Sequence, residues 1–158
     1  PGAGSNAIVA RVFSALGQPI ETGIASLSHL APTADRIAEA GAARLKDLGV
    51  ASRRADAITR VARIVADGQL RLEPGSDALA TRDALMEIDG VTDPLATTIV
   101  MRALRWPDAF PASDVSLQRA AGVANMRSLL DRAEDWRPWR AYAALHLWIN
   151  GEDRPCAS

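Results

Sequence analysis

The sequence has 158 residues and a formal net charge of −1, with 48% hydrophobic and 23% charged residues. These values are typical of a globular protein with one sizeable core, and they argue against a non-specific nucleic-acid binder, which needs a strongly basic surface. A local nucleic-acid site stays open. We see no apolar run of the roughly 18 residues that a membrane span needs and no secretory leader, so we expect an intracellular protein without a membrane partner.

The chain has one cysteine (Cys156), two histidines that are far apart (His29 and His146) and one lysine, Lys46. One thiol can form neither an internal disulfide nor a cysteine-ligated cluster, and two distant histidines do not indicate a zinc site. We therefore expect no required cofactor, no zinc and no iron–sulfur cluster.

The first half of the chain is predicted to form short helices that end at glycines. Residues 1–5 are interpreted as a linker or tag remnant. Thr33 is the expected N-cap of a helix that ends at Gly41. The helices are predicted over 5–16, 22–30, 33–40, 42–49 and 52–68, and the last is clearly amphipathic, with Ile58, Val61, Ala62 and Val65 on one face.

The second half follows a loop over 69–77 and shows the same pattern. Helices are predicted over 77–90, 92–106, 114–122, 125–135 and 136–150, and residues 151–158 are expected to be a flexible tail. No alternating strand of useful length appears, so the predicted fold class is all-α.

The segment "LMEIDGVTDPLATTIVMRAL" predicts two helices joined by a very tight turn. Gly90 suits a left-handed C′ position, Thr92 or Asp93 can cap the second helix, and Pro94 suits its first turn. The free N–H groups at such a helix start can bind a phosphate oxygen without any lysine. A plain helical hairpin in the core is the alternative.

The segment "AFPASDVSLQRA" places one acid, Asp114, between a loop and a predicted helix. The simplest interpretation is a helix cap, because aspartate is favoured at that position. A catalytic carboxylate is compatible with the cap, since the helix dipole stabilises a negative charge there.

Taken together, "IDGVTDPLATTIVMRALRWPDAFPASDVSLQRAAG" and "AEDWRPWRAYAALHLW" resemble the helix-hairpin-helix DNA glycosylases. The chain is most similar to the AlkA-type DNA-3-methyladenine glycosylases II, including those fused to Ada-type repair proteins. The resemblance implies a multi-helix glycosylase domain over 6–150, with the hairpin at about 83–105. It also implies a double-stranded DNA partner that carries alkylated bases, a monomeric protein, and a cytoplasmic location, associated with the nucleoid in a prokaryote.

By this resemblance the hairpin backbone at Gly90, Thr92 and Leu95 grips a DNA phosphate. Thr92 stands where the family has a second glycine, and Asp93 adds a negative charge near the expected phosphate. The resemblance leaves open whether a Na⁺ or K⁺ ion binds at the hairpin, through the backbone carbonyls of Met86, Ile88 and Val91.

The family's essential aspartate corresponds to Asp114, and the base pocket is implied to include Trp148 and Thr98. The carboxylate would stabilise an oxocarbenium-like transition state and orient water during hydrolysis of the N-glycosidic bond. Trp136 and Trp139 are expected to pack the last helix against the core, which leaves Arg137 and Arg140 for the surface or a phosphate.

The family position of a strand-cleaving lysine falls in Asp93–Leu95, where this sequence has no amine. The resemblance therefore implies a monofunctional DNA-3-methyladenine glycosylase without lyase activity. Such enzymes carry an N-terminal α/β domain and a wedge segment before the first helix, and neither is recognisable in this sequence. A DNA-binding module that keeps the fold with weakened or lost catalysis is the alternative, and an all-α scaffold without a DNA role is a third.

Overall fold

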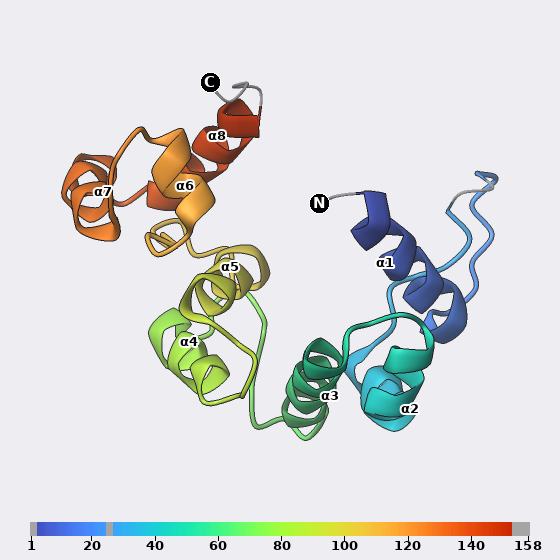
Figure 1. The fold of residues 1–158 in the computed structure, drawn as a ribbon. Coiled ribbons are helices and arrows are strands. Elements are labelled where there is room, and N and C mark those ends of the chain that lie inside the picture. Colours follow the sequence, from blue (N-terminus) through green and yellow to red (C-terminus); the bar gives the residue numbers. More distant parts are fainter. Residues whose placement is uncertain (1–2, 25–26, 153–158) are drawn as a thin grey trace. The chain divides into compact units, whose positions relative to one another are not determined.

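The structure is a computed structural model that describes residues 3–24 and 27–152, and Figure 1 shows its elements in chain order. Within these ranges the chain forms eight α-helices and one 3-10 helix, with an isolated β-bridge and no β-strand. The predicted all-α class is confirmed. Residues 1–2 of the expected linker and residues 153–158 of the expected tail, with Cys156, lie outside the described residues. No helix in the described ranges has the length and apolar character to cross a membrane.

The chain divides into two compact units, which we describe separately. The first unit consists of Pro1–Leu70 together with Ile88–Gly90, and the second consists of Arg71–Glu87 and Val91–Ser158. The predicted catalytic residue Asp114 and the predicted base-pocket residue Trp148 both belong to the second unit.

The first unit contains α1 (Ala3–Leu16), α2 (Ala34–Asp47) and α3 (Ser52–Ala66). Its core is built around Leu45, Val50 and Ala55, against which α1 contributes Ile8, Val12 and Leu16. The predicted amphipathic helix α3 buries Ala55, Ala57, Thr59 and Ala62, while Ile58, Val61 and Val65 are half-buried, so its inner face is broader than predicted.

Two features of α2 follow the sequence prediction. The side chain of Thr33 caps the helix by accepting a hydrogen bond from the backbone N–H of Arg36 (3.4 Å). Gly41 adopts a non-helical conformation, with φ of 71°, and divides the segment into two helical pieces. The glycine stop that the sequence placed at residue 41 is therefore confirmed as a kink.

The helix predicted over residues 22–30 is wrong. The described part of this segment is a loop, with a bridge between Pro19 and His29 and a hydrogen bond from Ile20 N–H to the Ser28 carbonyl (2.9 Å). The hydroxyl of Thr22 donates to the carbonyls of Ile24 (3.2 Å) and Leu27 (2.8 Å). Side-chain bonds of this kind compete with helical bonds and favour a turn.

The second unit contains five α-helices and the 3-10 helix. They are α4 (Ala78–Met86), α5 (Asp93–Ala103), α6 (Val115–Ala120), α7 (Met126–Ala133), η1 (Glu134–Trp136) and α8 (Arg140–Glu152).

All five of these α-helices are shorter than the sequence predicts, and α4 and α8 differ most clearly at one end. Helix α4 ends at Met86 with Glu87 as its C-cap, so Gly90 does not occupy the C′ position. Helix α8 begins at Arg140 instead of residue 136, because Pro138 forces the preceding Arg137 into an extended conformation (φ −64°, ψ 144°).

The core of the second unit brings α6 and α8 together. Leu117, Leu129 and Ala144 are completely buried, and the rings of Phe110 and Trp136 pack edge to face with centroids 5.9 Å apart. Gly151 of α8 lies against Ala120 of α6 so closely that an added Cβ would be 2.6 Å from the Ala120 Cβ. This close approach brings the C-terminal end of α6 against α8.

Candidate active site

Asp114 is the N-cap of α6, as the sequence predicts. Its Oδ1 atom accepts hydrogen bonds from the Ser116 backbone N–H (2.7 Å), the Ser116 hydroxyl (2.6 Å) and the Leu117 backbone N–H (3.4 Å). One carboxylate oxygen is thus held at the helix N-terminus, where the helix dipole favours negative charge.

The other carboxylate oxygen faces the last helix. The indole Nε1 of Trp148, in α8, donates a hydrogen bond to Asp114 Oδ2 at 3.2 Å. Both side chains are half-buried, and Trp148 also packs against the core of the second unit. The structure therefore brings together two of the predicted site residues that are 34 positions apart in the sequence.

The loop that leads to Asp114 is attached to α8 by an ion-pair cluster around Asp108. Arg140 binds Asp108 through three hydrogen bonds, from Nε to Oδ1 (2.7 Å) and from Nη2 to Oδ2 (2.8 Å) and to the backbone carbonyl (3.2 Å). Arg137 donates to the same carboxylate (2.8 Å). The side chains of Asp108 and Arg140 are only 14% and 10% exposed, so water screens this pair weakly.

The expectation that Arg137 and Arg140 are left for the surface or a phosphate is wrong for Arg140, which is buried against Asp108. Arg137 does lie at the surface, but it also binds Asp108. Arg137 also pairs with Glu134 (2.8 Å), and this arginine lowers the pKa of the Glu134 carboxyl. The expected packing role holds for Trp136 but not for Trp139, which is 58% exposed and lies beside Tyr142.

At the hairpin, Gly90 has φ of +92°, a conformation that favours glycine. Thr92 occupies the N-cap position of α5 without a side-chain cap bond, and Pro94 lies in the first turn. Thr92 is exposed and Leu95 is 45% exposed. The predicted phosphate grip at these residues stays a prediction.

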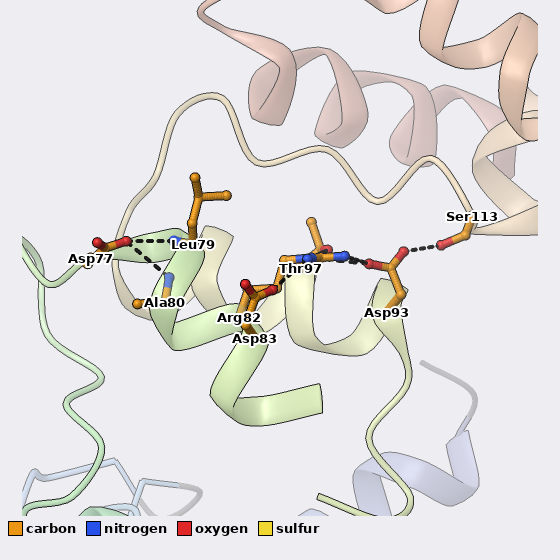
Figure 2. Close-up of polar contacts among 8 residues, drawn as sticks. All are labelled: Asp77, Leu79, Ala80, Arg82, Asp83, Asp93, Thr97 and Ser113. Carbon is orange, nitrogen blue, oxygen red and sulfur yellow. Dashed lines mark hydrogen bonds and ion pairs between the residues drawn. The ribbon is translucent and has the colours of Figure 1, made fainter. Parts of the chain in front are cut away.

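Asp93 does not cap α5 either. Its carboxylate binds the guanidinium of Arg82 in α4 and accepts a hydrogen bond from the Ser113 hydroxyl (2.5 Å), as Figure 2 shows. Burial raises the pKa of the Asp93 carboxyl, but the hydrogen bonds from Ser113 and Arg82 outweigh it, so the pKa lies below its ordinary value. The negative charge that the sequence places at the hairpin is therefore paired inside the protein.

The remaining predicted positions have local surroundings that neither require nor exclude their roles. The Thr98 hydroxyl donates to the Pro94 carbonyl of its own helix (2.7 Å) and is half-buried. Met86 is the last residue of α4, where a carbonyl has no helical partner and can bind an ion. Among the described residues, no three His, Cys, Asp or Glu side chains are placed to hold a metal ion together. This absence concerns side chains, so the question of an ion on the backbone carbonyls of Met86, Ile88 and Val91 stays as the resemblance left it.

Comparison with known proteins places this arrangement in a family. The model of the HhH-GPD superfamily of base excision DNA repair proteins matches residues 3–130. The chain belongs to this superfamily. It is 37% identical over 146 residues to the Mycobacterium tuberculosis protein named "Probable bifunctional transcriptional activator/DNA repair enzyme AlkA", covering 90% of this chain and 29% of the relative.

Two further relatives agree with the HhH-GPD assignment. DNA-3-methyladenine glycosylase 2 of Escherichia coli is 29% identical over 117 residues, which cover 74% of this chain and 42% of the relative. The crystal structure of DNA-3-methyladenine glycosidase from Bacillus halodurans is 25% identical with a TM-score of 0.71, and covers 97% of this chain and 70% of that one. The chain spans less than half the length of the Mycobacterium tuberculosis and Escherichia coli relatives.

Sequence reasoning missed two contacts around the candidate site, namely the Asp108–Arg140 pair and the Asp93–Ser113 hydrogen bond. Their partners are 32 and 20 residues apart, so no helical or loop spacing connects them. For the first contact the sequence did contain a signal. Asp108 lies between two prolines in "WPDAFPASD", and "WRPWR" supplies two arginines that could pair with it, because a buried charge needs a partner.

Proposed function

We propose that this chain is the catalytic part of a monofunctional DNA-3-methyladenine glycosylase that acts in base excision repair. It would bind double-stranded DNA and hydrolyse the N-glycosidic bond of a flipped alkylated purine such as 3-methyladenine. The family and the names of the relatives support this assignment. The observation that carries it is the Asp114 carboxylate, held at a helix start with the Trp148 indole 3.2 Å from its second oxygen.

The chemistry requires that the base leave the helical stack, because the glycosidic bond is inaccessible inside a duplex. As the bond to the base breaks, positive charge develops on the deoxyribose, and the Asp114 carboxylate would stabilise it and orient the attacking water. An N-alkylated purine already carries positive charge and leaves readily, so one carboxylate suffices. An indole face such as that of Trp148 would attract this cation by about 0.5–2 kcal/mol.

The expected absence of lyase activity follows from the position of the amines. The chain's one lysine, Lys46, belongs to the first unit and pairs with Asp56 at 3.1 Å. The first turn of α5 contains Pro94 and Leu95, neither of which can form a Schiff base with an opened sugar. Release of the base should therefore leave an intact strand with an abasic site.

The alternative is a DNA-binding module with weakened catalysis, which Thr92 and Asp93 in the hairpin favour. The pairing of Asp93 with Arg82 argues against it, because a paired carboxylate repels a phosphate less than a free one. Under either proposal DNA affinity should fall with salt concentration, as counterions are released from the duplex.

The deciding experiment measures release of free methylated bases from methylated duplex DNA by the full-length protein, with Asp114→Asn as the matched variant. Asparagine also caps helices well, so this substitution removes the charge and keeps the fold. We expect the wild type to release 3-methyladenine and the variant to release it about 10²–10³-fold more slowly. Tight, salt-dependent DNA binding without base release by the wild type would instead support the binding module.

A further inference from the structure

Asp93 connects three segments of the second unit. It is the first residue of α5, its Oδ1 binds Arg82 of α4, and its Oδ2 accepts the hydroxyl hydrogen bond of Ser113 in the loop before α6. Figure 2 shows the Arg82 and Ser113 side chains directed at the carboxylate from opposite sides. Ser113 is the residue immediately before Asp114.

We propose that Asp93 is a positioning residue for the excision reaction. From the start of α5 it holds Ser113, and through Ser113 it fixes the backbone of Asp114 at the start of α6. This inference rests on the proposed catalytic role of Asp114. The proposed role of Asp93 is indirect, since neither Asp93 nor Ser113 is assigned to touch the base or the sugar.

The geometry makes this link short and stiff. Ser113 and Asp114 are adjacent in the chain, so their Cα atoms are separated by about 3.8 Å. A hydroxyl that donates to a carboxylate forms one of the stronger hydrogen bonds of proteins, and the 2.5 Å separation is at the short end of that class. In the same loop, the Asp114 N–H donates to the carbonyl of the buried Pro111 (2.9 Å). The backbone before α6 is therefore held from both the hairpin and the core.

Arg82 neutralises the negative charge of the Asp93 carboxylate. Its Nε atom also donates to the hydroxyl of the buried Thr97 (3.3 Å), one turn further along α5. The Arg82 and Asp93 side chains are 29% and 33% exposed, so each charge is partly removed from water and needs the other. The Asp93 side chain is thus oriented by Arg82 of α4 as well as by its hydrogen bond with Ser113.

The functional consequence is a structural connection between the proposed phosphate-binding site and the proposed catalytic carboxylate. The start of α5 is where the hairpin would hold a DNA phosphate, and Asp114 is where the sugar charge would develop. A catalytic group must keep its geometry to within about 0.5 Å, which requires supporting contacts of this kind. Asp93 would fix the distance between the two while its negative charge remains neutralised by Arg82.

The first test is structural and needs no catalytic activity. In the full-length protein, nuclear magnetic resonance would record the Asp114 amide and the Trp148 indole N–H signals in Ser113→Ala, Asp93→Asn and the control Asp83→Asn. Asp83 contacts the same arginine at 3.0 Å but is 72% exposed, and its contact does not involve Ser113. We expect both signals to shift in the first two variants and to stay in place in the control. Unmoved signals in all three variants would overturn the proposal.

The second test separates excision from binding. Single-turnover base release with saturating enzyme and affinity for an abasic duplex would be measured for the same variants, with thermal melting to establish folding. We expect Ser113→Ala and Asp93→Asn to slow release about 10-fold, since small displacements of catalytic groups have effects of this order or larger, while affinity changes less than about twofold. Ser113→Thr, which keeps the hydroxyl, should restore most of the rate.

The outcomes distinguish this proposal from the proposed function. Base release that is unaffected by Ser113→Ala and Asp93→Asn would overturn the positioning role alone. Tighter DNA binding by Asp93→Asn at an unchanged rate would also overturn it, and would show Asp93 to be a repulsive charge. If the wild type releases no base while Ser113→Ala and Asp93→Asn show the signal shifts, the structural link would be supported and the glycosylase assignment overturned.

Discussion

Two helix starts in the second unit use the same residue in the same way but differ in their surroundings. Asp77 caps α4 by accepting hydrogen bonds from the N–H groups of Leu79 and Ala80, both at 3.0 Å (Figure 2), and Asp114 caps α6 with the same geometry. At α6 the second carboxylate oxygen also receives the Trp148 indole N–H, and the preceding loop is fixed by Arg140. A cap becomes a candidate catalyst through the neighbours that other segments bring to it.

The largest expected difference between the two caps concerns base release. Asp114→Asn should lower the single-turnover rate by about 10²–10³-fold, because the charge opposite the developing cation is lost. Asp77→Asn makes the same chemical change at the other cap and should alter the rate less than about twofold. Both variants should melt within a few degrees of the wild type, since asparagine is an equally good N-cap. Equal rate losses in the two variants would contradict the distinction.

The loop before Asp114 offers the next largest effect, on stability. Arg140→Gln leaves the 14% exposed Asp108 carboxylate without its main partner and should reduce the free energy of unfolding by about 3 kcal/mol. Arg137→Gln removes a 49% exposed partner of the same carboxylate and should cost less than about 1 kcal/mol. Urea unfolding of the full-length variants measures both values. A similar loss in the two variants would show that the Arg140 pair is not specially protected from water.

A smaller effect is expected at the indole that distinguishes the two caps. Trp148→Phe keeps an aromatic ring and removes the N–H that donates to Asp114 at 3.2 Å. Because a hydrogen bond to a charged group is worth about 1.5–3 kcal/mol, we expect its loss to slow base release by about 10–150-fold at most. Trp139→Phe, at a 58% exposed ring, is the control and should have no effect on the rate. An unchanged rate in Trp148→Phe would remove the indole from the site.

The smallest effect concerns a third acid at a helix start, Asp93, and its dependence on pH. Its pKa is lowered in the folded protein, so its contribution to stability is present above the pKa of the unfolded chain, about 3.9, and is lost as the pH falls through the folded value. Wild type should therefore melt at a higher temperature than Asp93→Asn at pH 7, and the difference should shrink as the pH falls below about 4. A difference that grows toward acid pH would contradict the lowered pKa.

Local patterns predicted much of the fold. The glycine at residue 41, the amphipathic face of α3 and the caps at Thr33 and Asp114 depend on contacts within a few residues, and each is present in the structure. The errors occurred where a local signal was overridden. The Thr22 hydroxyl bonds hold a loop in place of the helix expected over 22–30, and Pro138 delays the start of α8.

The candidate site divides in the same way. From the sequence by itself came the all-α class, the cap at Asp114, and the resemblance that joined Asp114 to Trp148. The carboxylate partners were decided only by the tertiary structure: Trp148 on Asp114, Arg140 on Asp108, and Arg82 with Ser113 on Asp93. The physical reason is distance along the chain. A cap is formed by neighbours two or three residues away, whereas a partly buried charge is satisfied by whichever donor the packing of α4, α5, the loop before α6, and α8 delivers to it.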